Sequence, residues 1–168
     1  MNELRIGSLC TGYGGLDLAV ESVFPSSRLA WYAEIEETAA LIMDSNYPGV
    51  KNVGDIKTVN WYEVEDIDIL TAGFPCQPVS NAGKRRGTND ARWLWPEVER
   101  AVRELRPRYV FLENVAAITN RGMGDVLGSL SAIGFDAEWS TYRASSVGAP
   151  HQRNRWFCLA WPASDSPD

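Results

Sequence analysis

Short apolar runs alternate along this chain with segments in which apolar residues recur at helical spacing. The runs are rich in β-branched and aromatic residues and are bounded by glycine, proline or polar clusters, so they predict β-strands. The predicted strands are Leu4–Cys10, Leu29–Ala33, a third that ends in Val53–Ile56, Asp68–Gly73, Tyr109–Glu113, Phe135–Arg143 and, as an edge strand, Trp156–Trp161.

The segments between these strands predict four helices. They are a short helix with Leu16, Ala19, Val20 and Val23 on one face, Glu36–Ser45, a helix that opens at Pro96 and is closed by Pro107, and Val126–Ile133, capped by Gly134. Strands and helices that alternate in this way predict an α/β fold, with a mostly parallel, Rossmann-like sheet and helices on both of its faces.

The length of 168 residues is enough for one domain. We assign residues 1–161 to that domain and residues 162–168 to a polar tail. No apolar run approaches the ~20 residues of a membrane span, and the first residues lack the flanks of a signal peptide, so we expect a cytoplasmic protein. Cys10, Cys76 and Cys158 are an odd, widely spaced set that suggests neither a disulfide framework nor a metal site.

Charge is distributed unevenly, although the net charge is −6. Residues 1–68 carry four basic against twelve acidic side chains, a balance of −8, whereas residues 84–108 carry eight against four, a balance of +4. The basic segment includes Lys84, Arg85 and Arg86, which could hold a phosphate backbone. In its helical part, the alternative is a solvated face with Glu99–Arg103 and Arg100–Glu104 pairs.

Cys76 lies in the segment Gly73-Phe74-Pro75-Cys76-Gln77-Pro78, directly after a predicted buried strand. The two prolines restrict the backbone on both sides of the thiol, and the strand places it at the carboxyl edge of the sheet, where open α/β proteins bind ligands. A buried structural cysteine is the alternative.

The glycine-rich segment 11–15 follows the first strand and opens a helix, which is the setting of a nucleotide-binding loop. Its G-x-G-G spacing favours a ligand such as S-adenosylmethionine over a dinucleotide. Glu34, at the end of the second strand, could accept hydrogen bonds from ribose hydroxyls, and Asp55 could accept one from an adenine amino group. Either acid could instead cap a helix.

Two further motifs follow downstream. Glu113-Asn114-Val115 ends a strand and places a carboxylate near Cys76. In His151-Gln152-Arg153-Asn154-Arg155 the two arginines share a face if the segment is extended. A strand-terminal turn and surface solvation are the respective alternatives, and for His151 we expect a loop role.

Four motifs in this order resemble those of the DNA cytosine-5 methyltransferases: Cys10–Gly15, Gly73–Gln77, Glu113–Val115 and Arg153–Arg155. The resemblance covers nearly the whole chain. It implies the S-adenosylmethionine-dependent methyltransferase fold, S-adenosylmethionine as cofactor, DNA as partner, no metal and no membrane. Family members continue into a target recognition region and a final segment, so we expect a catalytic domain that lacks both, completed by a second polypeptide.

The resemblance also implies the chemistry, which is methyl transfer to carbon 5 of cytosine through a covalent Cys76 adduct at carbon 6. It further implies a role in a restriction–modification system. Glu113 would hold or protonate ring nitrogen 3, Arg153 would contact the cytosine carbonyl, and Arg155 completes the catalytic set. Expected cofactor contacts are Cys10, Thr11, Gly12, Tyr13, Gly14, Gly15, Leu16, Glu34, Ile35, Asp55, Ile56 and Pro75. Expected substrate contacts are Gln77, Ser80, Lys84, Arg85, Arg86 and Asn114. The alternatives are an inactive remnant that binds the cofactor or another protein, and an RNA cytosine-5 methyltransferase.

Overall fold

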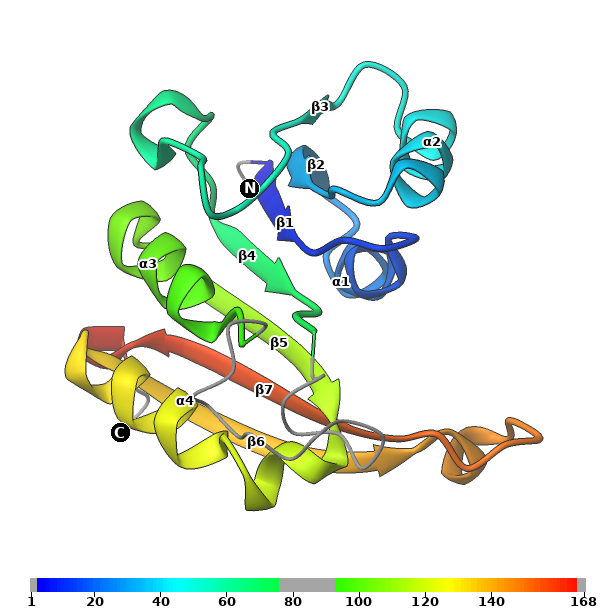
Figure 1. Cartoon of the computed structure of the whole chain (residues 1–168), viewed down its shortest axis with the longest axis vertical. Helices are drawn as coiled ribbons and strands as arrows, with labels where there is room; N and C mark the ends of the chain where they lie inside the picture. Colours follow the sequence, from blue (N-terminus) through cyan, green and yellow to red (C-terminus); the bar gives the residue numbers. More distant parts are fainter. Residues whose placement is uncertain (1–2, 76–92, 166–168) are drawn as a thin grey trace.

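The computed structural model describes residues 3–75 and 93–165, which form one seven-stranded sheet with helices on both faces (Figure 1). The strands are β1 (Leu4–Leu9), β2 (Ser27–Ala33), β3 (Lys51–Asn52), β4 (Ile69–Ala72), β5 (Tyr109–Val115), β6 (Phe135–Arg143) and β7 (Asn154–Pro162). The helices are α1 (Gly15–Val23), α2 (Glu37–Asn46), α3 (Trp95–Leu105) and α4 (Met123–Ala132).

The strand order is β3-β2-β1-β4-β5-β7-β6. Strands β1 to β5 pair with one another in parallel, whereas β7 is antiparallel to both β5 and β6. The predicted α/β fold with a mostly parallel sheet is therefore confirmed. No helix in the described part of the chain is long and apolar enough to cross a bilayer.

Two apolar cores lie on opposite faces of the sheet. Val98 of α3 and Leu130 of α4 are buried in the larger core, which also contains Trp156 of β7. Val20 of α1 and Met43 of α2 are buried in the smaller one, over β1 and β2. This arrangement brings the carboxyl ends of β1, β4 and β5, the three adjacent strands in the middle of the sheet, to one edge.

One predicted boundary and the predicted place of one strand are wrong. Strand β3 ends at Asn52 and not at Ile56, because Gly54 has a φ of 81° and donates its N–H to the Asn52 side chain. Strand β7 ends at Pro162, and the Ala163 N–H donates to the Gly134 carbonyl at 2.9 Å. The division into a domain of residues 1–161 and a tail of residues 162–168 stays a prediction.

The second error is the predicted place of β7, which is an interior strand between β5 and β6 and not an edge strand. Trp156, Cys158 and Ala160 point to one face of the sheet and are buried, whereas Phe157 and Leu159 point to the other. Apolar side chains on both faces are typical of a strand inside a sheet.

Beside α1, the face formed by β5, β7 and β6 carries no helix among the described residues. An open groove of about 380 Å³ lies there, lined by Leu16, Ala19 and Val23 from the predicted apolar face of α1. Phe111 of β5 and Phe157 of β7 lie on its floor. Val23 is 69% exposed, so only Val20 of that predicted face is fully buried.

Candidate active site

The loop between β1 and α1 has a backbone that favours glycine. Gly12 and Gly14 have φ of 56° and 76°, and Cys10, which is not a glycine, has a φ of 51°. A Cβ at Gly14 would lie 2.9 Å from the Sδ atom of Met43, so a larger residue would have to displace this buried side chain as well as adopt a positive φ. The Gly14 N–H donates to the Thr11 carbonyl, which closes the turn that leads into α1. Tyr13 is 64% exposed at the tip.

Glu34 ties this loop to the end of β2. Its Oε2 atom accepts a hydrogen bond from the Gly12 N–H at 2.8 Å, and Oε1 accepts from the N–H groups of Ile35 and Glu36 at 2.9 and 2.8 Å. The cap of α2 is Glu36, whose carboxylate accepts from the Thr38 and Ala39 N–H groups. Those contacts lower the pKa of Glu36. The alternative that Glu34 caps this helix is therefore wrong.

Asn52 was missed by the sequence analysis. Its Nδ2 donates to the Glu34 carbonyl at 3.0 Å, and its Oδ1 accepts from the N–H groups of Glu34 and Gly54. The side chain thereby fixes the end of β2 against the turn that follows β3. An asparagine two residues before a glycine is a turn signal, but nothing in the sequence indicates its contact with Glu34.

Asp55 stabilises its own turn, because its Oδ1 atom accepts from the Lys57 N–H at 3.0 Å. The neighbouring Ile56 is buried, while Ile35 is 74% exposed. Glu34 and Asp55 also lie close to Cys10: burial, followed by these two carboxylates, raises the pKa of the Cys10 thiol to about 12. Cys10 is therefore a neutral thiol beside two acids.

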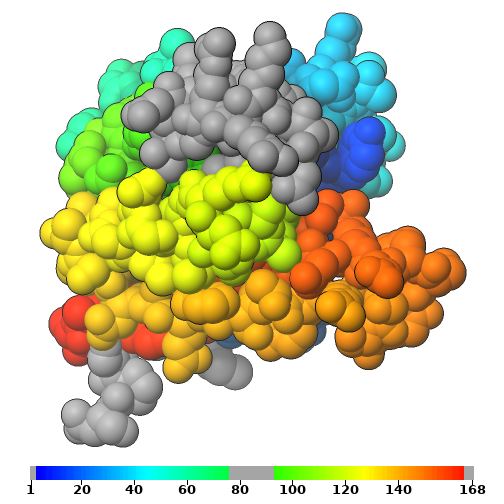
Figure 2. Space-filling model, turned by 60° about the horizontal axis from the view of Figure 1, so that its bottom comes forward, coloured from blue at the N-terminus to red at the C-terminus, as the bar shows by residue number. Residues whose placement is uncertain are grey.

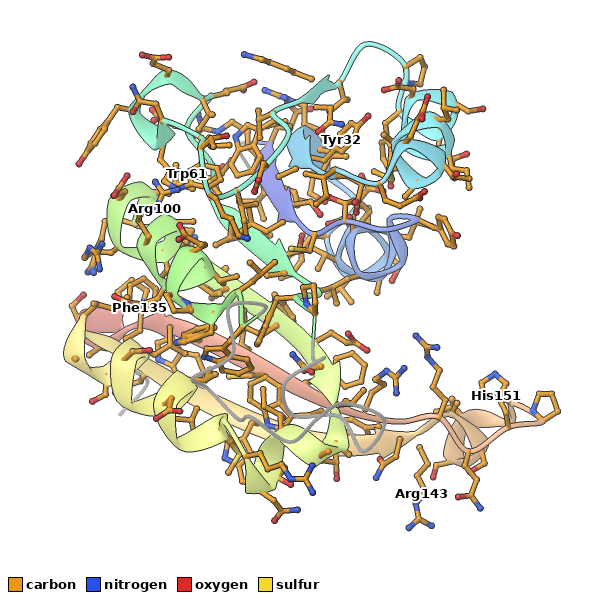
Figure 3. All side chains as sticks on the ribbon, in the orientation of Figure 1. Tyr32, Trp61, Arg100, Phe135, Arg143 and His151 are labelled. Carbon is orange, nitrogen blue, oxygen red and sulfur yellow. The ribbon has the colours of Figure 1, made fainter. Side chains whose placement is uncertain are left out.

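Arg100 of α3 holds the Asp55 turn from below (Figure 3). Its guanidinium donates to the carbonyls of Ile56 and Val59 at 2.6 and 3.1 Å and lies 5.5 Å from the centre of the Trp61 ring. Arg100 also pairs with Glu104. The pairs Arg100–Glu104 and Arg103–Glu99 both form, so these two arginines of the basic segment are occupied within the protein.

Glu113 and Asn114 occupy the end of β5. The Oε1 atom of Glu113 accepts from the Arg155 Nε at 2.7 Å, across the antiparallel β5–β7 pair. Asn114 is buried, and its Nδ2 donates to the Phe74 carbonyl at 3.0 Å. The Asn114 side chain thus fixes the backbone two residues before Cys76, and its expected contact with substrate stays a prediction.

Gly73 lies between the two groups of residues. A Cβ at this position would be 3.7 Å from the Cys10 carbonyl oxygen and 3.8 Å from the Oε2 atom of Glu113. The glycine loop and the Glu113 carboxylate therefore meet at the end of β4. The exposed Pro75 is the last residue described before Cys76.

The next described residue, Trp93, packs against Phe74 with ring centres 5.7 Å apart, and Trp95 lies at 5.6 Å. Cys76, Gln77, Ser80, Lys84, Arg85 and Arg86 lie outside the described residues. The chain thus enters and leaves the segment 76–92 at one aromatic cluster beside Asn114.

Arg153 and Arg155 do not share a face. Arg153 has a φ of 27°, which interrupts the extended backbone, and β7 begins at the next residue. Arg155 turns to Glu113, while Arg153 is exposed near the turn between β6 and β7. In the portion of the chain that is described, no cluster of His, Cys, Asp or Glu could hold a metal ion.

A family model for C-5 cytosine-specific DNA methylases matches residues 4–166. The chain belongs to this family. The resemblance stated from the four motifs is therefore confirmed for the family and its fold. The positions expected to act in catalysis and binding remain predictions.

Relatives within the family are Type II methyltransferases. The chain is 37% identical over 161 residues to M.CviJI of Paramecium bursaria Chlorella virus IL3A, covering 94% of this chain and 43% of that protein. It is 33% identical over 166 residues to M.HhaI of Haemophilus parahaemolyticus, covering 96% and 50%. The chain thus spans about half the length of these relatives.

Two solved structures share the fold. The Entamoeba histolytica methyltransferase EhMeth superposes with a TM-score of 0.81 at 20% identity, covering 96% of this chain and 53% of that one. The S. pombe Dnmt2 methyltransferase superposes with a TM-score of 0.80 at 20% identity, covering 98% and 53%.

Proposed function

We propose that this chain is the catalytic part of a DNA cytosine-5 methyltransferase, which transfers a methyl group from S-adenosylmethionine to carbon 5 of cytosine in DNA. The observation that supports this most is the position of Gly73 between the Cys10 carbonyl and the Glu113 carboxylate. A cofactor held by the glycine loop and a base held by Glu113 would meet there, three residues before Cys76.

The residues around the glycine loop fit S-adenosylmethionine. Among the described residues, no atom lies within 4 Å of where a Cβ of Gly12 would be, so a ligand can approach this backbone closely. Glu34 would accept the ribose hydroxyls with the lone pairs that its amide contacts leave free. The second oxygen of Asp55 would accept an adenine N–H, and the exposed Ile35 would pack on the ring. The remaining proposed cofactor contacts are Cys10, Thr11, Tyr13, Gly14, Gly15, Leu16, Ile56 and Pro75.

When bound, the cofactor supplies an electrophilic methyl group. In the proposed reaction the Cys76 thiolate bonds to carbon 6 of the target cytosine, and the electrons of the 5,6 double bond shift to carbon 5, which takes the methyl group. Glu113 holds ring nitrogen 3, oriented by Arg155, and Arg153 contacts the ring carbonyl. A base then removes the carbon 5 proton, and the returning electrons expel the thiolate.

The target base has to leave the helical stack, at a cost of a few kcal/mol in duplex DNA. We propose that Gln77, Ser80, Lys84, Arg85 and Arg86 contact the DNA and help to offset this cost. Asn114 contributes indirectly, through the Phe74 carbonyl.

The test is transfer of a labelled methyl group to duplex DNA, measured for the wild type, Cys76→Ser, Glu113→Gln and the control Cys158→Ala. We expect Cys76→Ser to abolish transfer and Glu113→Gln to reduce it ~10²–10⁴-fold. Cys158 is buried in the larger core, so Cys158→Ala removes a thiol that substrate does not reach and should retain transfer. Transfer by Cys76→Ser would contradict the mechanism, and a preference for tRNA in competition would contradict DNA as the substrate.

We propose further that a second polypeptide, which supplies target recognition, covers the open groove beside α1. Sheets in α/β proteins carry helices on both faces, and here Phe111, Phe157 and Val23 form an apolar surface of the size that a helix would cover. The relatives are about twice as long as this chain.

Co-expression with the polypeptide encoded next to this chain tests that proposal. Copurification that Phe157→Asp abolishes, with full methyl transfer only by the pair, is the expected result. Unchanged copurification of Phe157→Asp, or full transfer by the isolated chain, would contradict it. A complex that binds S-adenosylmethionine tightly without transferring the methyl group would support the inactive remnant.

A further inference from the structure

Strands β6 and β7 continue beyond the end of β5. Val115, the last residue of β5, pairs with Arg155, but the β6–β7 ladder extends one pair further to Arg143 and Asn154. The connection between them leaves the body of the protein, as Figures 1 and 3 show. We call residues 143–155 the arm. In the space-filling view of Figure 2 it stands out at one side of the molecule.

The arm is positively charged, although the chain as a whole is acidic. It contains Arg143, His151, Arg153 and Arg155 and has no aspartate or glutamate, while the whole chain has a net charge of −6. Arg155 is neutralised by Glu113. Arg143, His151 and Arg153 are exposed, and within residues 3–75 and 93–165 no carboxylate pairs with them.

Several other arginines among the described residues pair with carboxylates. Arg5 pairs with Asp68, Arg28 with Glu3 and Glu65, and Arg103 with Glu99. Lys51 and Lys57 are also exposed and have no carboxylate partner among the described residues, but the arm differs from them because it gathers two such arginines and a histidine on one projecting element.

The arm is ordered by its own backbone. The Ala144 N–H donates to the Gln152 carbonyl at 2.9 Å, and the Ala149 N–H donates to the Ala144 carbonyl at 3.1 Å. Gly148, with a φ of 90°, makes the turn possible. The arm carries little apolar surface, since Val147 is its one large aliphatic side chain. A protein partner would usually need a larger apolar contact, whereas a phosphate backbone needs cations and N–H groups.

We propose that the arm binds the DNA backbone beside the target cytosine, with Arg143 and His151 contacting phosphates. This inference rests on the proposed function, because strand β7 carries Arg155 to Glu113 and the arm to the flanking DNA. Arg143 pairs with Asn154, the neighbour of Arg155, so the phosphate contacts begin directly beside the candidate catalytic pair. These contacts are independent of sequence, since they read no base edge.

Salt dependence of DNA binding tests the proposal. Each phosphate contact adds about 0.9 to the slope of log K against log salt, so Arg143→Gln should lower the slope by ~0.9 and the affinity about eightfold at 0.1 M salt. Lys51→Gln is the matched control, because it removes one exposed cation from β3, at the opposite edge of the sheet. Arg143→Lys should restore most of the slope.

Binding is measured with the full chain and a duplex that need not contain a target site, so the result does not depend on methyl transfer. An unchanged slope in Arg143→Gln and in Arg143→Gln/His151→Gln, with normal thermal melting, overturns the proposal, and so does a wild type that does not bind DNA. Salt-dependent binding that requires Arg143 but is never accompanied by transfer would leave the arm supported and refute the proposed activity.

Discussion

Asp17 is a buried carboxyl group that should make the stability of this protein depend on pH. It lies in the first turn of α1, is 1% exposed, and accepts hydrogen bonds from the hydroxyls of Ser8 and Thr71 at the ends of β1 and β4. Burial raises the pKa of Asp17 from 3.8 to about 6, against the opposing effect of the two hydroxyls. Replacing it by asparagine keeps the shape and removes the titration.

The magnitude follows from linkage. A pKa raised by about 2 units corresponds to ~3 kcal/mol. Because the folded protein binds this proton more tightly than the unfolded chain, the contribution is fully present below pH 3.8 and is lost as the pH rises through about 6. Between pH 4.5 and 7, the wild type should lose about 2 kcal/mol relative to Asp17→Asn.

Urea unfolding of both proteins at several pH values measures this difference. Other carboxyl groups, such as Asp68, whose pKa is lowered beside Arg5, titrate in both proteins and cancel. Asp125→Asn, which makes the same replacement on the exposed first turn of α4, is the matched control. If the wild type and Asp17→Asn differ by the same free energy at every pH, the reasoning is refuted.

Three further predictions concern the candidate site and its support. Gly7→Ala should destabilise the fold by ~1–3 kcal/mol in urea unfolding, because its Cβ would overlap the buried Trp31 ring; unchanged stability would contradict this packing. Gly73→Ala, whose Cβ meets only ordinary contacts, should keep its stability but lose methyl transfer, because the methyl group fills the space between the two ligands; full transfer would refute that reading. Arg100→Met should weaken binding of S-adenosylmethionine in calorimetry by releasing the Ile56 carbonyl, and unchanged affinity would exclude this positioning role.

The sheet could be predicted from the sequence because its strands are short apolar runs separated by glycine and proline signals. The hydrophobic pattern gave wrong predictions where contacts between distant residues determine the end of a strand or its place in the sheet. Strand β3 ends at Asn52 because that side chain bonds to Glu34 and Gly54, and no local signal indicates a contact across 18 residues. The sequence predicts β7 as an edge strand, because nothing in its residues indicates that β6 pairs with it on the side away from β5.

The candidate site could be predicted as a set of residues at one edge, because strand ends converge there. The contacts between these residues could not be predicted. The pairing of Glu113 with Arg155 depends on the antiparallel register of β5 and β7, which the sequence does not define. The spacing of Arg100 from Glu97 and Glu104, by three and four residues, is typical of ion pairs on a solvated helix face. Nothing in the sequence indicates that Arg100 also donates to the Ile56 carbonyl.

A protein with a negative net charge can bind DNA if the carboxylates that face the DNA are hydrogen-bonded or paired with cations. The acids at the candidate cofactor loop already accept N–H groups: Glu34 from Gly12, and Asp55 from Lys57. At the other end of the same sheet edge, Arg155 neutralises Glu113, and the arm beyond it carries no acid at all. Net charge sets the long-range repulsion, which salt screens over ~10 Å at 0.1 M. The local arrangement therefore decides the contact. Arg155, at the start of β7, is paired with Glu113 of β5, whereas Arg153, two residues earlier, has no carboxylate partner in the described part of the chain.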